Sequence, residues 1–292
     1  MPVEALTESA CIVPALPSPV LKKAFGWWLR RMFRSDFHSV RILSGTDRFL
    51  TQLGESSDPA IVVANHSAWW DPLLGLYLHD RFMAGRAALA PMDAAQLRRF
   101  SFFRRLGIFG IEPDSPHSLK AMTGYVRGEF ERNPRSTVWI TPQGEFADVR
   151  LPIRVRPGAA ALAAQLSESR VDMVALAIEY VYWTDRRPEL MLAVRPVERP
   201  KADEADGGRS STPDWTRAIR DTMQANATAL AEAVISRDDG RFDLLVGRSS
   251  EAGTARVNPL YDVWLRATGR AGVVRAREPQ PTMGREVLRG ER

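Results

Sequence analysis

The stretch IVVANHSAWWDPLLGLYL (residues 61–78) places a histidine, His66, five positions before an aspartate, Asp71. Histidine changes its charge near neutral pH, so it is well suited to take a proton from a reacting hydroxyl. A carboxylate on one imidazole nitrogen fixes the tautomer, raises the basicity of the ring and leaves the other nitrogen free. The pair therefore predicts general-base catalysis by His66, with Asp71 as its orienting partner.

Two local elements must position this pair. The apolar run at 60–65 is typical of a buried strand, and residues 72–82 are predicted to form a helix. His66 then lies just beyond a strand, where open α/β sheets place their reactive groups. Asp71 followed by Pro72 is also a good helix start, with aspartate as N-cap and proline as first residue. A capping role is thus the simpler alternative for Asp71.

Further along the chain, short apolar runs alternate with helical patterns. Strands are expected at 106–112, 136–141, 173–183 and 189–197, and helices after Ser115, at 158–167 and after Thr212. Strands that alternate with helices indicate crossover connections and parallel pairing. We therefore expect an α/β fold, a mixed and mostly parallel sheet flanked by helices, with an amphipathic helix near the N-terminus.

The predicted organisation has four parts. Residues 1–20 form a flexible tail, 21–44 an amphipathic helix, 45–236 the α/β domain, and 237–292 a basic, mobile C-terminal extension. In the second part apolar residues recur at helical spacing, and basic residues share another face. Such a helix either packs on the core or lies in a membrane interface, with tryptophans at headgroup depth and arginines on anionic lipid. The sequence leaves both alternatives open.

The composition limits the classes of protein that remain. Of the 292 residues 45% are apolar, which is ample material for a buried core. The one cysteine, Cys11, excludes a disulfide framework and any cysteine-rich metal site, and no metal is expected. The 40 basic residues suit anionic lipid or nucleic acid equally. No nucleic-acid-binding module, phosphate loop or serine nucleophile elbow is visible, and no apolar run is long enough to span a membrane.

Several sequence blocks follow one another in an order and spacing that are specific when taken together. They are Asn65 to Asp71 with the pattern N-H-x4-D, a basic-aromatic stretch leading into a Gly-x-Phe-x-Ile strand (102–115), the strand and turn VWITPQGEF (138–146), a glycine-alanine helix (156–163) and a further strand (173–180). Over roughly residues 45–200 these blocks resemble the glycerophospholipid (lysophosphatidic acid type) acyltransferases.

The resemblance implies a reaction and its partners. His66 deprotonates an acceptor hydroxyl, which attacks the thioester of acyl-CoA or acyl carrier protein, while Asp71 orients the histidine. No covalent acyl-enzyme is needed, and no cofactor is bound permanently, because the acyl donor is itself a substrate. The expected partners are a membrane lipid surface and the acyl donor, with acyl carrier protein as one alternative donor, and nucleic acid is not expected. The expected location is peripheral, at the cytoplasmic face of the membrane.

The third block departs from the family pattern at residues that the resemblance implies in acceptor binding. The family has glutamate, glycine, threonine and arginine there, whereas this chain has Gln143, Gly144, Glu145 and Phe146. A carboxylate beside a glycerol phosphate repels it. We therefore expect the acceptor to be a hydroxyl or amine of a membrane lipid, and favour a lipid without phosphate, such as a glycolipid or an aminolipid.

Further candidates for substrate binding keep an alternative open. Asn65 belongs to the first block, and Arg150, Arg154 and Arg156 follow the turn, where they offer guanidinium groups for a phosphate. These arginines suit the alternative function, a 1-acylglycerol-3-phosphate O-acyltransferase of phospholipid synthesis. Two other classes also stay open. One is a thioesterase-like hydrolase that uses the same pair with water as acceptor, and the other is a nucleic-acid-binding protein, for which the aromatic and basic residues at 98–105 are the superficial argument.

Overall fold

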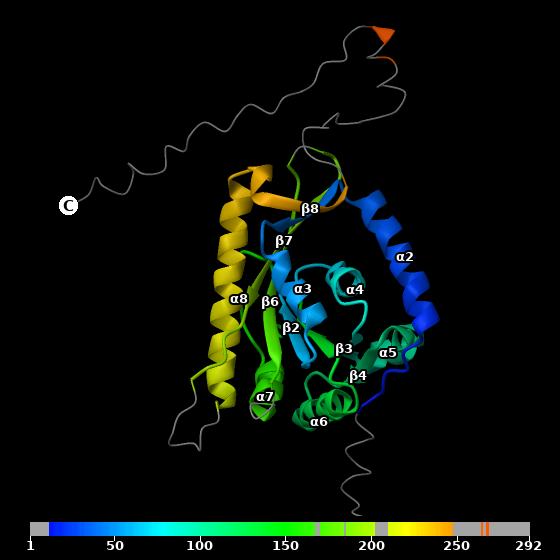
Figure 1. The fold of residues 1–292 in the computed structure, drawn as a ribbon, viewed down its shortest axis with the longest axis vertical. Helices are drawn as coiled ribbons and strands as arrows, with labels where there is room; N and C mark the ends of the chain where they lie inside the picture. Colours follow the sequence, from blue (N-terminus) through cyan, green and yellow to red (C-terminus); the bar gives the residue numbers. More distant parts are fainter. Residues whose placement is uncertain are drawn as a thin grey trace, which may run out of the picture.

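The computed structural model describes residues 12–166, 170–183, 185–201, 210–247, 264 and 267–268. Within these residues the strands form one eight-stranded sheet that lies between layers of helices (Figure 1). The order across the sheet is β4 (Ile108–Ile111), β3 (Ala87–Asp93), β5 (Ser136–Ile140), β2 (Ala60–Ala64), β6 (Asp172–Val181), β7 (Glu189–Pro196), β1 (Ser39–Leu43) and β8 (Phe242–Gly247). Neighbouring strands are parallel except in the pairs β6–β7 and β1–β8. The expected mixed, mostly parallel sheet is confirmed.

Strand β2, which leads into the His66 segment, lies inside the sheet. It pairs in parallel with β5 on one side and with β6 on the other, and all of its residues are buried. Its side chains alternate between two apolar clusters, with Ile61 and Val63 in one and Val62 in the other. A continuous apolar run is what a parallel strand needs when helices cover both of its faces.

The helices form one layer on each face of the sheet. On the Val62 face, α2, α3 and α4 contribute Leu29, Leu50 and Leu74 to the core. On the other face, α6, α7 and α8 cover Ile61, and Figure 1 shows α8 and α2 on opposite sides of the sheet. The helices are α2 (Pro19–Asp36), α3 (Asp47–Glu55), α4 (Asp71–Phe82), α5 (Ala94–Arg99), α6 (Pro116–Arg132), α7 (Pro157–Gln165) and α8 (Thr212–Ile235), with short 3-10 helices η2 (Ser101–Leu106) and η4 (Asp239–Arg241). None of the described helices combines the length and the apolar character needed to cross a bilayer.

The expectation of a flexible tail over residues 1–20 is wrong for its second half. Residues 1–11 lie outside the described part of the chain. Val13 forms an antiparallel bridge with Gly110 of β4, with N···O distances of 3.0 and 2.7 Å. Glycine is needed at position 110 because a Cβ there would lie 2.9 Å from the Val13 side chain. The backbone around Val13 is therefore held against the sheet, and α2 begins at Pro19.

The segment 21–44 is more than the amphipathic helix that was expected. Helix α2 ends at Asp36, and Ser39–Leu43 then form β1, a strand between β7 and β8. The strand was missed because Arg41 interrupts its apolar pattern. In the structure Arg41 is 2% exposed, and its Nε lies 3.2 Å from the carboxylate of Glu189 on β7. A partner nearly 150 residues away thus makes burial of this charge possible.

The C-terminal extension also begins later than expected. The sequence assigned residues 237–292 to it, but Phe242–Gly247 form β8, which pairs antiparallel with β1 and completes the sheet. The sheet therefore extends beyond the predicted domain of residues 45–236 at both ends. Nearly all of the remaining extension, from residue 248 onwards, lies outside the described residues.

Candidate active site

The histidine and the aspartate meet at the end of β2. His66 lies two residues beyond the strand, and Asp71 is the first residue of α4. His66 Nδ1 is 2.9 Å from Asp71 Oδ2. The Asp71 side chain is 1% exposed, whereas that of His66 is 16% exposed. The predicted contact is therefore present, with the carboxylate buried and the imidazole partly accessible. Because Nδ1 faces the carboxylate, Nε2 is the nitrogen available to exchange a proton with a substrate.

The carboxylate of Asp71 does more than start a helix. Its Oδ2 accepts hydrogen bonds from the backbone N–H groups of Ser67 and Ala68 at 2.7 and 2.9 Å, as well as facing His66. The N-cap position is occupied by Trp70, so the prediction of Asp71 as N-cap is wrong by one residue. The hydrogen bonds of the Asp71 carboxylate close the loop between β2 and α4 instead. The aspartate thus holds the loop and the imidazole together.

Tyr180 completes this arrangement and was not found from the sequence. It lies on β6, and its hydroxyl donates a hydrogen bond to Asp71 Oδ1 at 2.6 Å. Burial and the neighbouring carboxylate raise the pKa of Tyr180, so the hydroxyl keeps its proton and remains a donor. The signal available in the sequence was a tyrosine near the end of a mostly apolar strand. Its partner was not readable, because 109 residues separate Tyr180 from Asp71.

The turn after β5 holds the backbone of His66. Gln143 is buried, and its Oε1 accepts a hydrogen bond from His66 N at 2.9 Å. Ala147 N donates to His66 O at 2.8 Å, and the Phe146 ring lies 4.3 Å from the imidazole, centroid to centroid. Gly144 has φ +70°, a conformation that side chains disfavour, and this lets the chain turn between these contacts. The third block therefore meets the first in space.

Asn65 occupies a structural position beside the site. Its Oδ1 accepts from Ile178 N at 2.8 Å, and its Nδ2 donates to Ile178 O at 3.0 Å. The amide thereby fastens the end of β2 to β6 just before His66. Direct substrate binding by Asn65, which the sequence suggested, stays a prediction.

The three candidate arginines are not gathered as one phosphate cradle. Arg150 forms two hydrogen bonds with Asp148, at 2.8 and 2.6 Å. Arg156 lies over Gly144 and pairs with Asp114 at 3.1 Å. Arg154 is exposed, and so is Glu145 on the turn. Two of the three guanidinium groups thus already face an aspartate, although such exposed pairs are weak.

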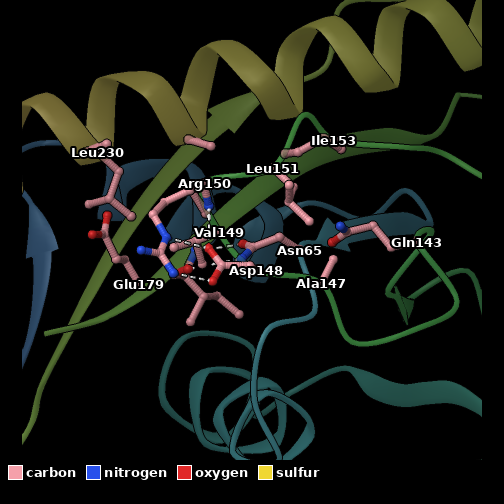
Figure 2. A pocket seen from close by; sticks show the side chains of 14 residues that line it. Asn65, Gln143, Ala147, Asp148, Val149, Arg150, Leu151, Ile153, Glu179 and Leu230 are labelled. Carbon is pink, nitrogen blue, oxygen red and sulfur yellow. Dashed lines mark hydrogen bonds and ion pairs between the residues drawn. The ribbon is translucent and has the colours of Figure 1, made fainter.

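Two pockets flank the end of β2 on opposite faces of the sheet. The pocket on the α4 face, of about 90 Å³, includes Ala64, Asp71 and Gly75 and is mainly apolar. The pocket on the α8 face, of about 100 Å³, includes Asn65, Gln143 and Glu179 and is shown in Figure 2. Ile178 borders both pockets. The segment that carries His66 therefore contributes residues to two cavities of different character, Ala64 and Asp71 to one and Asn65 to the other.

No group of three or more metal-ligating side chains occurs among the described residues. The four protein atoms around the Asp71 carboxylate are hydrogen-bond donors or a ring nitrogen, an arrangement that suits proton transfer.

Comparison with known proteins identifies the class of the domain that carries this site. Residues 44–179 match the protein-family model Acyltransferase, and this segment contains His66, Asp71 and Gln143. The chain thus carries an acyltransferase domain, and the protein is an acyltransferase, as the sequence resemblance implied. One similar solved structure is the 1-acyl-sn-glycerophosphate (LPA) acyltransferase PlsC from Thermotoga maritima. It is 17% identical, with a TM-score of 0.48, over 72% of this chain and 79% of that one. The comparison with curated proteins gave no match.

Proposed function

We propose that the protein transfers a fatty acyl chain from acyl-CoA or acyl carrier protein to a hydroxyl or amine of a membrane lipid. The observation that carries the proposal is the contact between His66 Nδ1 and the buried Asp71 carboxylate, within a segment that matches the acyltransferase family. His66 is the base, and Asp71 and Tyr180 are positioning residues.

The proposed reaction needs one proton acceptor and no covalent intermediate on the protein. Nε2 of His66 takes the proton of the acceptor hydroxyl as the oxygen attacks the thioester carbonyl carbon. The resulting tetrahedral centre collapses, the C–S bond breaks, and the thiolate leaves with the carrier. The imidazolium then returns its proton to the thiolate. Asp71 favours this cycle because its charge stabilises the imidazolium.

The pocket on the α4 face is a suitable site for the acyl chain. Its walls combine aliphatic side chains from β3, β5 and α4 with the indole of Trp139, and Asp71 lies at one border. Apolar walls favour a hydrocarbon chain because burial removes it from water. A chain seated there has its thioester end close to the histidine and its hydrocarbon away from solvent.

The acceptor is proposed to lack a phosphate. Asp148 and Asp114 already face Arg150 and Arg156, so a phosphate would have to compete with a carboxylate for either guanidinium. Glu145 replaces a family threonine beside them. A phosphate needs several guanidinium or backbone donors and is repelled by carboxylates. A neutral or amine-bearing lipid does not need these donors and is not repelled by the carboxylates.

The outer side of α2 is a candidate membrane surface, at the cytoplasmic face in the function proposed here. Trp27 is 64% exposed, and Lys23 and Arg31 lie one helical turn before and after it. Trp28 contacts Phe25, and the Phe25 ring lies 5.6 Å from Phe102 of η2. Aromatic side chains flanked by basic residues suit an anionic lipid interface. Leu29 and Phe33 on the other side of α2 are core residues, so core packing leaves the outer side of the helix available for the proposed membrane contact.

An acceptor competition tests this function. The purified protein is given acyl-CoA with equal amounts of lysophosphatidic acid, a glycolipid and an aminolipid, and the products are quantified by mass spectrometry. The expected result is acylated glycolipid or aminolipid, with little acylated lysophosphatidic acid. A strong preference for lysophosphatidic acid supports the alternative in phospholipid synthesis and overturns the proposed acceptor. Free fatty acid that forms equally without acceptor indicates a hydrolase and overturns acyl transfer.

A further inference from the structure

The pocket on the α8 face contains a carboxylate that the proposed acid–base chemistry does not use. Glu179 lies on β6 next to Tyr180, so the two side chains point to opposite faces of the sheet. Tyr180 reaches Asp71 on the α4 face. Glu179 faces the other way, where Ala227, Leu230 and Ala231 of α8 form part of the same pocket (Figure 2).

The surroundings of Glu179 leave its carboxylate without a donor. It is half-buried, burial raises its pKa, and no hydrogen bond or ion pair to it occurs within the described residues. The nearby guanidinium of Arg150, in the same pocket, is already bound through two hydrogen bonds to Asp148. A partly buried carboxylate among aliphatic side chains is unfavourable unless hydrogen-bond donors reach it. A ligand in the pocket is a source of such donors.

This pocket is joined to the candidate base through the protein backbone. Gln143 and Ala147 line it, and these two residues hold the N–H and C=O groups of His66. A ligand seated there contacts the two residues whose hydrogen bonds hold the backbone of the proposed base. The pocket on the α4 face, proposed for the acyl chain, lies across the same strand end. The acceptor is therefore expected on the α8 side.

We infer that this pocket binds the head group of the acceptor and that the head group is a sugar, with Glu179 accepting hydrogen bonds from its hydroxyls. This inference rests on the proposed function, in which His66 activates an acceptor hydroxyl. Sugar hydroxyls both donate and accept, which matches a carboxylate beside the Arg150–Asp148 pair. Leu151 and Leu230 provide aliphatic contacts for the apolar face of the ring.

Other head groups fit these side chains less well. A phosphate brings only acceptors and negative charge, so Glu179 and Asp148 repel it. An ammonium is attracted by these two carboxylates, but it only donates hydrogen bonds and cannot accept one from the guanidinium of Arg150. The mixture of donors and acceptors therefore favours a polyol over either charged group.

The test compares acceptors that share one alkyl chain and differ in the head group. With lauroyl-CoA as donor, kcat/KM is measured for decyl β-D-glucoside, 1-decanol and decyl phosphate, all below micelle formation. Glu179→Gln keeps the shape of the side chain and removes its charge. It is expected to lower kcat/KM for the glucoside 10- to 100-fold relative to that for 1-decanol, the scale for losing hydrogen bonds to a charged group. Glu232→Gln, which changes an exposed carboxylate of α8, is the matched control and keeps the wild-type ratio.

A second variant narrows the pocket from α8. Ala231→Leu adds volume at a partly exposed helix position and is expected to reduce use of the glucoside more than use of 1-decanol. Ala231→Leu also provides the test of the inference if Glu179→Gln proves unstable in thermal melts. An unchanged glucoside-to-decanol ratio in the folded variants overturns the inference, and so does a wild-type preference for decyl phosphate.

Binding measurements separate this inference from the proposed function. Decyl glucoside is titrated calorimetrically into the wild type and into Glu179→Gln without any acyl donor. If no acceptor is acylated but glucoside binding depends on Glu179, the proposed function fails and the sugar site stands. If acyl transfer proceeds and glucoside affinity is the same in both proteins, the sugar site fails and the function stands.

Discussion

The two pockets beside His66 differ in chemistry although they border the same strand. Ala64 lines the pocket on the α4 face and Asn65, the next residue, lines the pocket on the α8 face. The same holds on β6, where Tyr180 reaches the Asp71 carboxylate on the α4 face and Glu179 faces α8. The alternation of side chains along a strand lets one strand end serve two environments. A hydrocarbon and a polar head group can thus approach one base from opposite faces.

The largest effect is expected at His66, because the residues just before it, Ala64 and Asn65, line the two pockets. Replacing His66 with alanine removes the proposed base, so acyl transfer is expected to fall by about 10²–10⁴-fold for every donor and acceptor. Asp71→Asn leaves His66 without its carboxylate partner, and its loss of activity is expected to lie within the same range. Steady-state assays of thiol release measure both. His117→Ala, at an exposed position on α6, is the control and keeps wild-type turnover. Near-normal turnover of His66→Ala contradicts the proposed mechanism.

The wall of the α4-face pocket is expected to make stability depend on pH. Trp139 Nε1–H donates to His79 Nδ1 at 3.3 Å, and His79 Nε2–H donates to Arg86 O at 3.0 Å. Burial, with the charges of Lys22 and Arg86, lowers the pKa of His79 from 6.5 to about 4. The unfolded chain therefore binds a proton that the folded protein does not between these values, and stability falls as pH drops from about 6.5 to about 4. The loss amounts to roughly 3 kcal/mol at 1.36 kcal/mol per pH unit.

Thermal melts across this pH window check the prediction. His79→Gln cannot titrate, so its melting temperature should change less between pH 7 and pH 4.5 than that of the wild type. His117→Ala lacks an exposed histidine and is expected to keep the wild-type slope. If the melting temperature of His79→Gln changes with pH as much as that of the wild type, other groups dominate the pH dependence of stability.

A change confined to the α4-face pocket should affect only the acyl donor. A Cβ at Gly75 would lie 3.4 Å from the Trp139 ring, which is ordinary contact, whereas a larger side chain must enter the pocket. Gly75→Leu is therefore expected to reduce kcat/KM for long acyl-CoA about tenfold relative to short acyl-CoA. The acceptor preference should not change. Gly75→Ala is the control, and a parallel loss for all chain lengths would argue against this pocket as the acyl site.

The smallest effect is expected at the membrane surface. Trp27→Ala and Trp28→Ala together remove exposed aromatic area from α2 and should weaken binding to anionic vesicles roughly three- to tenfold. Binding of the wild type should also fall as salt rises. Sedimentation with vesicles measures both, while activity on a detergent-dispersed acceptor stays nearly constant. Point changes are preferable to removal of residues 1–42, because that truncation also removes most of β1. Unchanged vesicle binding would assign the membrane contact elsewhere.

The sequence predicted those strands whose burial follows from their own composition. Strands β2 and β5 are apolar runs bounded by polar turns, and both were expected. The strands that were missed depend on distant partners or carry an unusual residue. Arg41 in β1 is buried because Glu189 faces it, and β3 contains Pro91, which lies beyond the residues that pair with β5. The partner of Arg41 has no local signature in the chain, and a proline argues against a strand rather than for one.

The candidate site also contains contacts that are predictable from local sequence and contacts that depend on distant residues. The His66–Asp71 contact was predictable because both residues lie within one short loop and helix start. The roles of Gln143 and Tyr180 were not predictable from local pattern, since their hydrogen bonds to this loop span 77 and 109 residues. Resemblance to a family drew attention to the turn of Gln143. It did not reveal Glu179, whose relevance follows from which face of β6 it occupies.

The position of β1 has a consequence for biosynthesis. Its two neighbours in the sheet, β7 and β8, leave the ribosome about 150 and 200 residues after it. At about 5–20 residues per second this delay is on the order of ten seconds or more, during which β1 has two unpaired edges. The nascent chain is therefore expected to need protection by chaperones until residue 196 has emerged. Ribosome-bound chains that end before β7 should be cut by protease near residues 37–45, and chains that expose β7 should resist cleavage there.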